Sequence, residues 1–83
     1  MGTPRVLLFG KPGCHLCDEA RVVVERVCDE LHVGWAEENI LDDPRLSERY
    51  AEQIPVTFVD GEQHAIWRVD EGRLRKALAE LPG

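Results

Sequence analysis

The heptapeptide Lys11-Pro12-Gly13-Cys14-His15-Leu16-Cys17 carries the strongest structural signal in this chain. Before it, residues 5–9 form a nearly continuous apolar run, which is typical of a buried strand with neighbours on both faces. From its first cysteine onward, apolar side chains recur at steps of three and four, which predicts an amphipathic helix over residues 14–31. The proline and glycines between the two patterns interrupt both of them. The two cysteines are therefore predicted to lie where the first strand gives way to the first helix.

Two short segments are predicted to follow. Residues 33–40 alternate loosely between apolar and polar side chains and end in acidic residues, which is typical of an edge strand. Asp43-Pro44 predicts the start of a second helix, with a capping carboxylate followed by proline at the first helical position. This helix is expected to end before Ile54-Pro55, because a residue that precedes proline disfavours the helical region.

The last part of the chain is predicted to form a hairpin and a helix. Residues 56–59 and a second run ending at Trp67 flank Asp60-Gly61, a strong hairpin-turn signal. Asp70 is placed to cap a final helix with buried leucines at positions 74, 78 and 81. This order of elements predicts an α/β fold, a four-stranded mixed sheet flanked by helices. With 83 residues, the chain is expected to form a single domain over residues 1–83.

Charge and cysteine content narrow the expected function classes. There are 16 acidic and 10 basic side chains, and the formal net charge is −6. Nucleic acid and anionic membrane surfaces require clustered lysine and arginine, so neither is an expected partner. No apolar run is long enough for a signal peptide or a membrane span. Because the 3 cysteines do not suggest a secreted disulfide scaffold, we expect a cytoplasmic monomer whose close cysteine pair is catalytic or metal-binding.

Cys14 and Cys17 are one helical turn apart, so both sulfur atoms lie on one face and are able to form a disulfide. Cys14 is predicted in the first helical turn, where unpaired backbone N–H groups and the helix dipole favour a thiolate. Because a thiolate is the attacking species in disulfide exchange, Cys14 is the candidate nucleophile and Cys17 the candidate resolving thiol. Lys11 either adds positive charge and contacts substrate or is a solvated loop residue.

The cysteine pair also has a metal-binding interpretation. Cys14, Cys17, Cys28 and His32 have the spacing C-x2-C-x10-C-x3-H, which matches that of some zinc sites. On one continuous helix, however, Cys17 and Cys28 would lie about 16 Å apart along the axis, too far to share one ion. We therefore expect no metal site and a buried, inert Cys28. His32 and His64 are expected on the surface.

A strand followed by KPGCHLC at residues 11–17 resembles the glutaredoxin branch of the thioredoxin superfamily, and the resemblance covers essentially the whole chain. The Cys-x-Leu-Cys-Asp-Glu-Ala sequence at residues 14–20 and the later Ile-Pro-Val look most similar to small bacterial glutaredoxin-like proteins. The resemblance implies a thioredoxin fold in its minimal glutaredoxin form. It also implies a cis peptide bond before Pro55, facing the dithiol, and a substrate backbone that pairs with Ile54 like an added strand.

The chain departs from typical glutaredoxins after the last predicted strand. Those proteins carry a glycine pair whose backbone binds the glutathione carboxylate, whereas this chain has Trp67-Arg68. These side chains would obstruct the usual approach, although the Arg68 guanidinium would attract a carboxylate. Asp70 matches an acidic helix cap of the family. Trp67 also has a structural interpretation, as a core residue that ends the hairpin.

These patterns predict a glutaredoxin-like thiol–disulfide oxidoreductase in which Cys14 and Cys17 carry the reaction. The candidate substrate-binding residues are Lys11, Ile54, Pro55, Arg68 and Asp70. The expected substrates are protein disulfides or glutathione mixed disulfides, with glutathione or thioredoxin reductase as electron donor and no bound cofactor. Two alternatives stay open: a module that binds a partner under redox control, and a metal or iron–sulfur carrier that uses the exposed thiolates.

Overall fold

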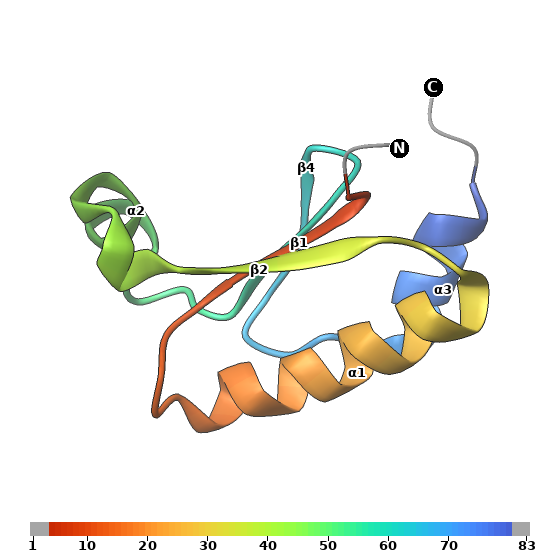
Figure 1. Cartoon of the computed structure of the whole chain (residues 1–83), viewed down its shortest axis with the longest axis horizontal. Helices are drawn as coiled ribbons and strands as arrows, with labels where there is room; N and C mark the ends of the chain where they lie inside the picture. Colours follow the sequence, from red (N-terminus) through yellow and green to blue (C-terminus); the bar gives the residue numbers. More distant parts are fainter. Residues whose placement is uncertain (1–3, 81–83) are drawn as a thin grey trace.

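The computed structural model describes residues 4–80, whose elements are arranged as Figure 1 shows. In chain order they are β1 (Val6–Gly10), α1 (His15–Leu31), β2 (Trp35–Asn39), the 3-10 helix η1 (Ile40–Asp42), α2 (Pro44–Tyr50), β3 (Val56–Val59), β4 (Glu62–Ile66) and α3 (Glu71–Ala79). Within residues 4–80, no helix has the length and apolar character needed to cross a membrane.

The strands form one mixed sheet in the order β2-β1-β3-β4. β1 runs parallel to β2 and antiparallel to β3, and β3 pairs with β4 as an antiparallel hairpin. β1 is therefore central, which accounts for its nearly continuous apolar sequence, whereas β2 lies at an edge and exposes Glu37 and Glu38. The predicted fold class, a four-stranded mixed sheet flanked by helices, is confirmed.

Helices α1 and α3 cover one face of the sheet (Figure 1). Because side chains alternate between the two faces of a strand, Val6 and Val59 meet the helices on this side. They belong to one buried cluster with Val24 and Val27 of α1 and Leu74 of α3. Full burial of an aliphatic side chain of this size contributes about 1.5–3 kcal/mol. The cluster therefore fixes α1, the helix that begins at the cysteine pair, on the sheet.

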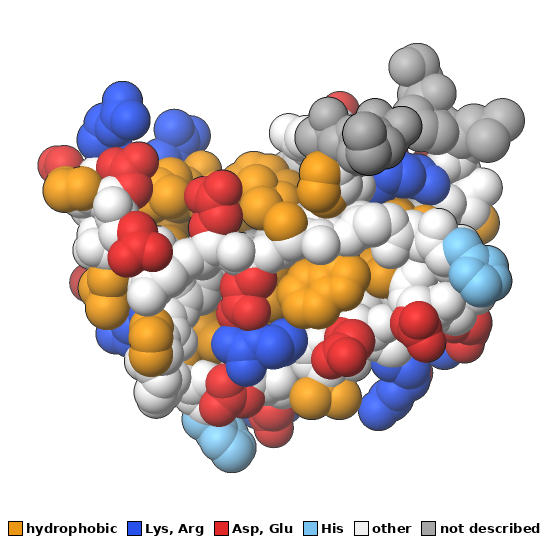
Figure 2. Space-filling view, in the orientation of Figure 1, with side chains coloured by type: hydrophobic (Ala, Val, Ile, Leu, Met, Phe, Trp, Pro, Cys, Tyr) orange, Lys and Arg blue, Asp and Glu red, His pale blue; other side chains and the backbone are white. Residues whose placement is uncertain are grey.

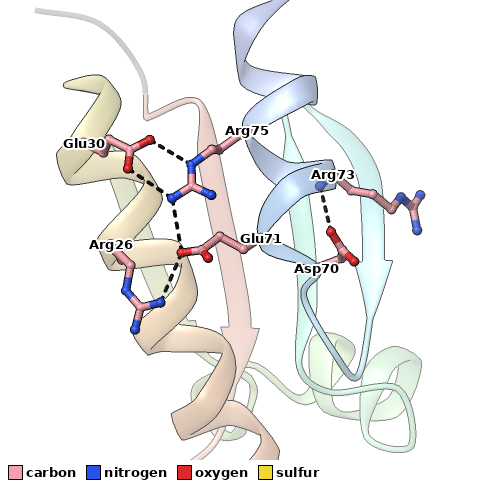
Figure 3. Close-up of polar contacts among 6 residues, drawn as sticks. All are labelled: Arg26, Glu30, Asp70, Glu71, Arg73 and Arg75. Atoms are coloured by element: carbon pink, nitrogen blue, oxygen red, sulfur yellow. Dashed lines mark hydrogen bonds and ion pairs between the residues drawn. The ribbon is translucent and has the colours of Figure 1, made fainter.

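Ion pairs join α1 to α3 outside this core (Figure 3). Arg75 donates to the two carboxylate oxygens of Glu30 at 2.8 and 3.0 Å. Glu71 lies 3.4 Å from Arg75 and 3.2 Å from Arg26. These side chains are at the surface, where water screens their charges, so the pairs align the helices more than they stabilise them.

The opposite face of the sheet is covered by α2 over part of its area. Phe9, Tyr50 and Phe58 pack there with ring centroids 5.4, 5.2 and 6.1 Å apart. A shallow apolar hollow of about 370 Å³ remains beside them, bordered by Leu7 and Leu46. Figure 2 shows hydrophobic surface in the hollow next to α2, and over the rest of this view hydrophobic side chains are interspersed with acidic and basic ones.

Two predicted boundaries differ from the structure. Residues 40–42 form a 3-10 helix beyond the edge strand, because the Asn39 side chain accepts a hydrogen bond from the Leu41 N–H at 2.9 Å and turns the chain. The strand that leads to Trp67 ends at Ile66.

The burial of three residues refines the prediction further. Leu31, which the helical pattern places on the apolar face, is 37% exposed as the last residue of α1. His64, expected on the surface, has a buried Nε2, and this burial lowers the pKa of its imidazole. Leu74 and Leu78 of the predicted leucine stripe are buried, and position 81 lies outside the described residues.

Candidate functional site

Cys14 caps the N-terminus of α1. The helix begins at His15, so Cys14 lies one residue before the predicted first turn, with extended backbone angles of φ −93° and ψ 113°. Its Sγ accepts a hydrogen bond from the Cys17 backbone N–H at 3.2 Å. A helix begins with unpaired N–H groups and the positive end of its dipole, and both stabilise negative charge on a sulfur atom held there. The partly exposed Cys14 sulfur therefore lies where a thiolate is favoured and accessible.

Cys17 differs from Cys14 in its burial. It has no exposed surface and belongs to an apolar cluster that includes Phe9, Ile54 and Val56. Burial, together with the hydrogen bond to Cys14, raises the pKa of the Cys17 thiol to about 11, and the Lys11 backbone N–H acts against this rise. The pair therefore combines an accessible sulfur with a buried, protonated thiol one helical turn away.

Gly10 allows β1 to approach the buried thiol. A Cβ atom at this position would lie 3.0 Å from the Cys17 Sγ and 3.2 Å from its Cβ. The first distance is at the limit below which Cβ contacts essentially never occur, so any side chain at position 10 would displace Cys17 or the strand. The end of the first strand thus fixes the position of the second cysteine, a constraint that the sequence analysis did not identify.

The Ile54–Pro55 peptide bond is cis, as the family resemblance implies. Ile54 and Pro55 are buried, and Ile54 shares its apolar cluster with Cys17. The Pro55 carbonyl accepts a hydrogen bond from the Trp67 backbone N–H at 2.8 Å. The proline loop therefore connects the dithiol to the segment between β4 and α3.

Trp67 is not a core residue, so the structural interpretation of this position is wrong. Its side chain and backbone are 51% exposed, and its φ of 65° is in the left-handed region. The indole Nε1 donates to the Glu52 carbonyl at 3.1 Å, which holds the ring away from the hydrophobic core. Arg68 is exposed beside it.

Asp70 caps α3, as its sequence position predicts. Its Oδ1 accepts the Arg73 backbone N–H at 2.8 Å (Figure 3). This hydrogen bond satisfies one of the unpaired donors at the start of the helix. The Asp70 carboxylate is therefore already engaged with its own helix.

A polar network lies on the other side of Gly10. Arg21 of α1 donates to the Glu37 carboxylate at 2.7 and 2.6 Å and to Asp18 at 2.9 Å. These residues and Lys11 line an open hollow of about 500 Å³. Glu37 is near enough to raise the pKa of Cys17 slightly further. Sequence reasoning missed Glu37, whose parallel pairing in the sheet gives no local signal.

The four residues with zinc-like spacing do not come together. Cys17 and Cys28 lie on the single continuous helix α1, about 16 Å apart along its axis. Cys28 is 1% exposed inside the main core, and burial raises the pKa of its thiol. Among residues 4–80, no group of three or more His, Cys, Asp or Glu side chains is arranged to hold a metal ion.

The chain is similar in sequence and in structure to several known proteins. The chain is similar to uncharacterized protein Rv0508 of Mycobacterium tuberculosis (strain H37Rv), with 29% identity over 84 residues that cover 95% of this chain and 87% of that protein. It also resembles the X-ray structure of protein XcR50 from X. campestris, with a TM-score of 0.74, 27% identity and coverage of 93% and 99% of the two chains.

A mutant thioredoxin from Halobacterium salinarum is also similar in structure, with a TM-score of 0.59, 26% identity and coverage of 88% of this chain and 71% of the thioredoxin. This likeness agrees with a thioredoxin-like fold for the chain. The family model described as Glutaredoxin-like domain (DUF836) matches residues 5–79, which include the cysteine pair and the cis-proline loop, and the chain therefore belongs to that family of the thioredoxin superfamily.

Proposed function

We propose that the protein is a thiol–disulfide oxidoreductase that reduces disulfides of proteins or small molecules through Cys14 and Cys17. The observation that carries this proposal is the unequal pair of free thiols. Cys14 is partly exposed at the helix N-cap, and Cys17 is buried in the same apolar cluster as the residue before the cis proline. An accessible attacking sulfur with a protected partner is what two-step disulfide exchange requires.

In the proposed first step, the Cys14 thiolate attacks one sulfur of the substrate disulfide. A Cys14–substrate disulfide forms, the substrate S–S bond breaks, and the second substrate sulfur leaves as a thiolate that takes a proton from water. Hydrogen bonding to the Cys17 N–H and the helix N-terminus stabilise the attacking thiolate.

In the proposed second step, Cys17 loses its proton and attacks the Cys14 sulfur. The remaining substrate sulfur leaves and is protonated, so the substrate gains two electrons and two protons while a Cys14–Cys17 disulfide forms. Because its pKa is about 11, Cys17 stays protonated at neutral pH and does not compete for the first attack. Glutathione or thioredoxin reductase would return the protein to the dithiol form.

The substrate would lie between the cysteine pair and the cis-proline loop. We assign Ile54 and Pro55 the role of aligning the substrate backbone. Both side chains are buried, and Ile54 shares its apolar cluster with Cys17, so the loop is held beside the dithiol. Lys11 and Arg68 are exposed cations, one before the cysteine pair and one after β4, and would attract acidic groups. Asp70, bonded to its own helix, would shape the site by fixing the start of α3.

Turnover with defined electron donors tests this function. Purified protein would be given a mixed disulfide, with either glutathione and its reductase or thioredoxin reductase as the donor, and NADPH consumption would be followed. The Cys17→Ser variant is expected to stop at a stable Cys14 mixed disulfide that mass spectrometry detects. If folded wild-type protein with free thiols shows neither turnover nor a trapped intermediate, a redox-controlled binding or metal-carrying role replaces this proposal.

We further propose that the protein works as a monomer in the reducing cytoplasm, without a resident cofactor. A reducing compartment would keep all three thiols free, the state in which the dithiol is ready to attack. Light scattering of the purified protein tests the monomer, and thiol trapping in lysed cells tests the redox state.

A further inference from the structure

A groove of about 390 Å³ opens between α1 and the connection from β4 to α3. Leu16, Ala20 and Val23 line it from α1, and Trp67, Arg68 and Val69 line it from the connection. Leu16 lies between the two cysteines in the sequence, so one end of the groove is formed by the turn of α1 that carries Cys17. Its lining is mainly apolar, which suits a hydrophobic side chain.

Exposed apolar side chains converge on this groove. Within residues 4–80, the exposed large hydrophobic side chains are those of Val22, Leu31, Leu41 and Trp67. Val22 and Trp67, at 53% and 51% exposure, both line the groove. Exposed apolar surface gathered beside a reactive group is typical of a contact site.

The backbone of Trp67 adds an independent observation. Its φ of 65° is tolerated by glycine but is an outlier for a bulky aromatic residue. Two hydrogen bonds hold it there, from its backbone N–H to Pro55 and from its indole to Glu52. Neither core packing nor backbone preference explains an exposed tryptophan in this conformation, and strain of this kind concentrates at functional sites.

The groove rim carries one carboxylate and one guanidinium, those of Glu19 and Arg68. Glu19 faces His15, 3.9 Å away. Arg68 takes part in none of the ion pairs or side-chain hydrogen bonds formed among residues 4–80. An acidic group on the occupant would complement this free guanidinium.

We propose that the groove receives a bulky apolar side chain next to the reactive cysteine of a polypeptide disulfide, with an acidic side chain of the same polypeptide at Arg68. Trp67 and Arg68 would then favour polypeptide substrates over glutathione, which has no bulky apolar side chain to fill the groove. This inference rests on the proposed disulfide-exchange function and names its substrate class.

Mixed-disulfide formation by the Cys17→Ser variant tests the inference, because that variant reports the first step alone. The probes are a peptide disulfide with Phe before and Glu after its cysteine, the same peptide with Gly for Phe, the same peptide with Lys for Glu, and glutathione disulfide. We expect the Phe/Glu peptide to react about 10-fold faster than its Gly counterpart, the size of effect of an aromatic anchor at a contact site.

Substitutions in the Cys17→Ser background assign that preference to the groove. Trp67→Gly is expected to abolish the Phe preference, and it suits the backbone because glycine tolerates a φ of 65°. Trp67→Asn, another residue tolerated in the left-handed region, replaces it if circular dichroism shows misfolding. Arg68→Ala should remove the preference for Glu over Lys. Leu31→Ala, at the far end of α1, should change neither preference.

The outcomes separate the two proposals. An equal Phe preference in Cys17→Ser with and without Trp67→Gly, or glutathione disulfide reacting as fast as the Phe/Glu peptide, would overturn the groove assignment and leave the exchange function intact. Absence of any mixed disulfide with all four probes would instead reject the exchange function itself.

Discussion

The two ends of helix α1 each bury a thiol, but the surroundings differ. Cys17 and Cys28 are 0% and 1% exposed, and burial raises the pKa of both. Cys28 lies among aliphatic side chains of the main core, and burial alone accounts for its shift. Cys17 has in addition the Cys14 sulfur as a hydrogen-bond partner. Gly10 of β1 packs against it, and the Glu37 carboxylate is close enough to raise its pKa.

From this difference we expect a thiol that is only buried to be inert, and we take the start of the helix to be what makes the Cys14–Cys17 pair a candidate for chemistry. At that end, the N-cap holds Cys14 partly exposed while its partner stays protected. At the other end, residues 4–80 place no second cysteine and no helix N-terminus where they could stabilise a thiolate on Cys28. The predictions below test this contrast between the two ends.

The largest expected effect separates Cys14, the proposed nucleophile, from Cys28, which we expect to be inert. Cys14→Ser should lower disulfide-reduction turnover by on the order of 10³-fold or more, because a hydroxyl at neutral pH cannot replace a thiolate nucleophile. Cys28→Ala should leave turnover within a factor of about two, since its thiol lies in the core away from the pair. Turnover assays on both variants, with circular dichroism as a folding control, make the measurement. Equal losses would show that the two ends do not differ as described.

A methyl group at position 10 should perturb the reactive end through packing. In Gly10→Ala the new Cβ would lie 3.0 Å from the Cys17 Sγ, so strand or thiol must move, and we expect unfolding to cost about 1–3 kcal/mol less free energy. Urea unfolding measures the loss.

Gly34→Ala is the matched control for that substitution. Its Cβ would meet its nearest neighbour, the Pro4 Cα, at an ordinary 3.8 Å. Its midpoint of unfolding should therefore stay near that of the wild type, and a similar loss in both variants would point to a general backbone cost of replacing glycine.

The pH dependence of stability should distinguish the two buried thiols. Folding raises the pKa of Cys17 from 9.0 to about 11, so the unfolded chain gives up this proton first as the pH rises. The stabilisation is thus complete below pH 9 and is lost as the pH approaches 11, by on the order of 1–3 kcal/mol. Urea unfolding between pH 7 and 11 would show this slope (on the order of 0.5–1.5 kcal/mol per pH unit above pH 9).

Two cysteine variants show which thiol causes this pH dependence of the free energy of unfolding. Cys17→Ala should reduce the pH dependence more than Cys28→Ala, because burial is the single cause of the smaller rise at Cys28. A larger reduction in Cys28→Ala would reverse the order of the two pKa values and contradict the account of the reactive end.

Local patterns were enough to predict the fold, but only part of the site. Apolar runs, the Asp43-Pro44 start and the Asp60-Gly61 turn gave the element order because each is a short-range preference. The cysteine pair and its position at the helix start were found for the same reason. The local patterns did not predict contacts between segments that are distant in the sequence, such as the approach of Gly10 to Cys17.

The position of Trp67 shows why such features escape sequence reasoning. A large aromatic residue after a strand is ordinarily buried, and only its bonds to Pro55 and Glu52 keep it exposed in a left-handed conformation. Those partners are distant in sequence, so no local pattern encodes the arrangement. This departure from prediction lies beside the candidate site, where local preference and tertiary structure disagree.

The smallest expected effect concerns the ion pairs at the Cys28 end of α1. Glu30→Gln removes the charge that Arg75 contacts at 2.8 and 3.0 Å, but both side chains are at the surface and screened by water. The free energy of unfolding, measured in urea, should fall by a small fraction of the fall expected for Gly10→Ala. The difference from wild type should shrink as the sodium chloride concentration is raised. Turnover should be unchanged, since the pair lies at the end of the helix remote from Cys14. A salt-independent loss of stability as large as that of Gly10→Ala would mean that α1 is held at its far end by these charges, and not by the aliphatic cluster beneath it.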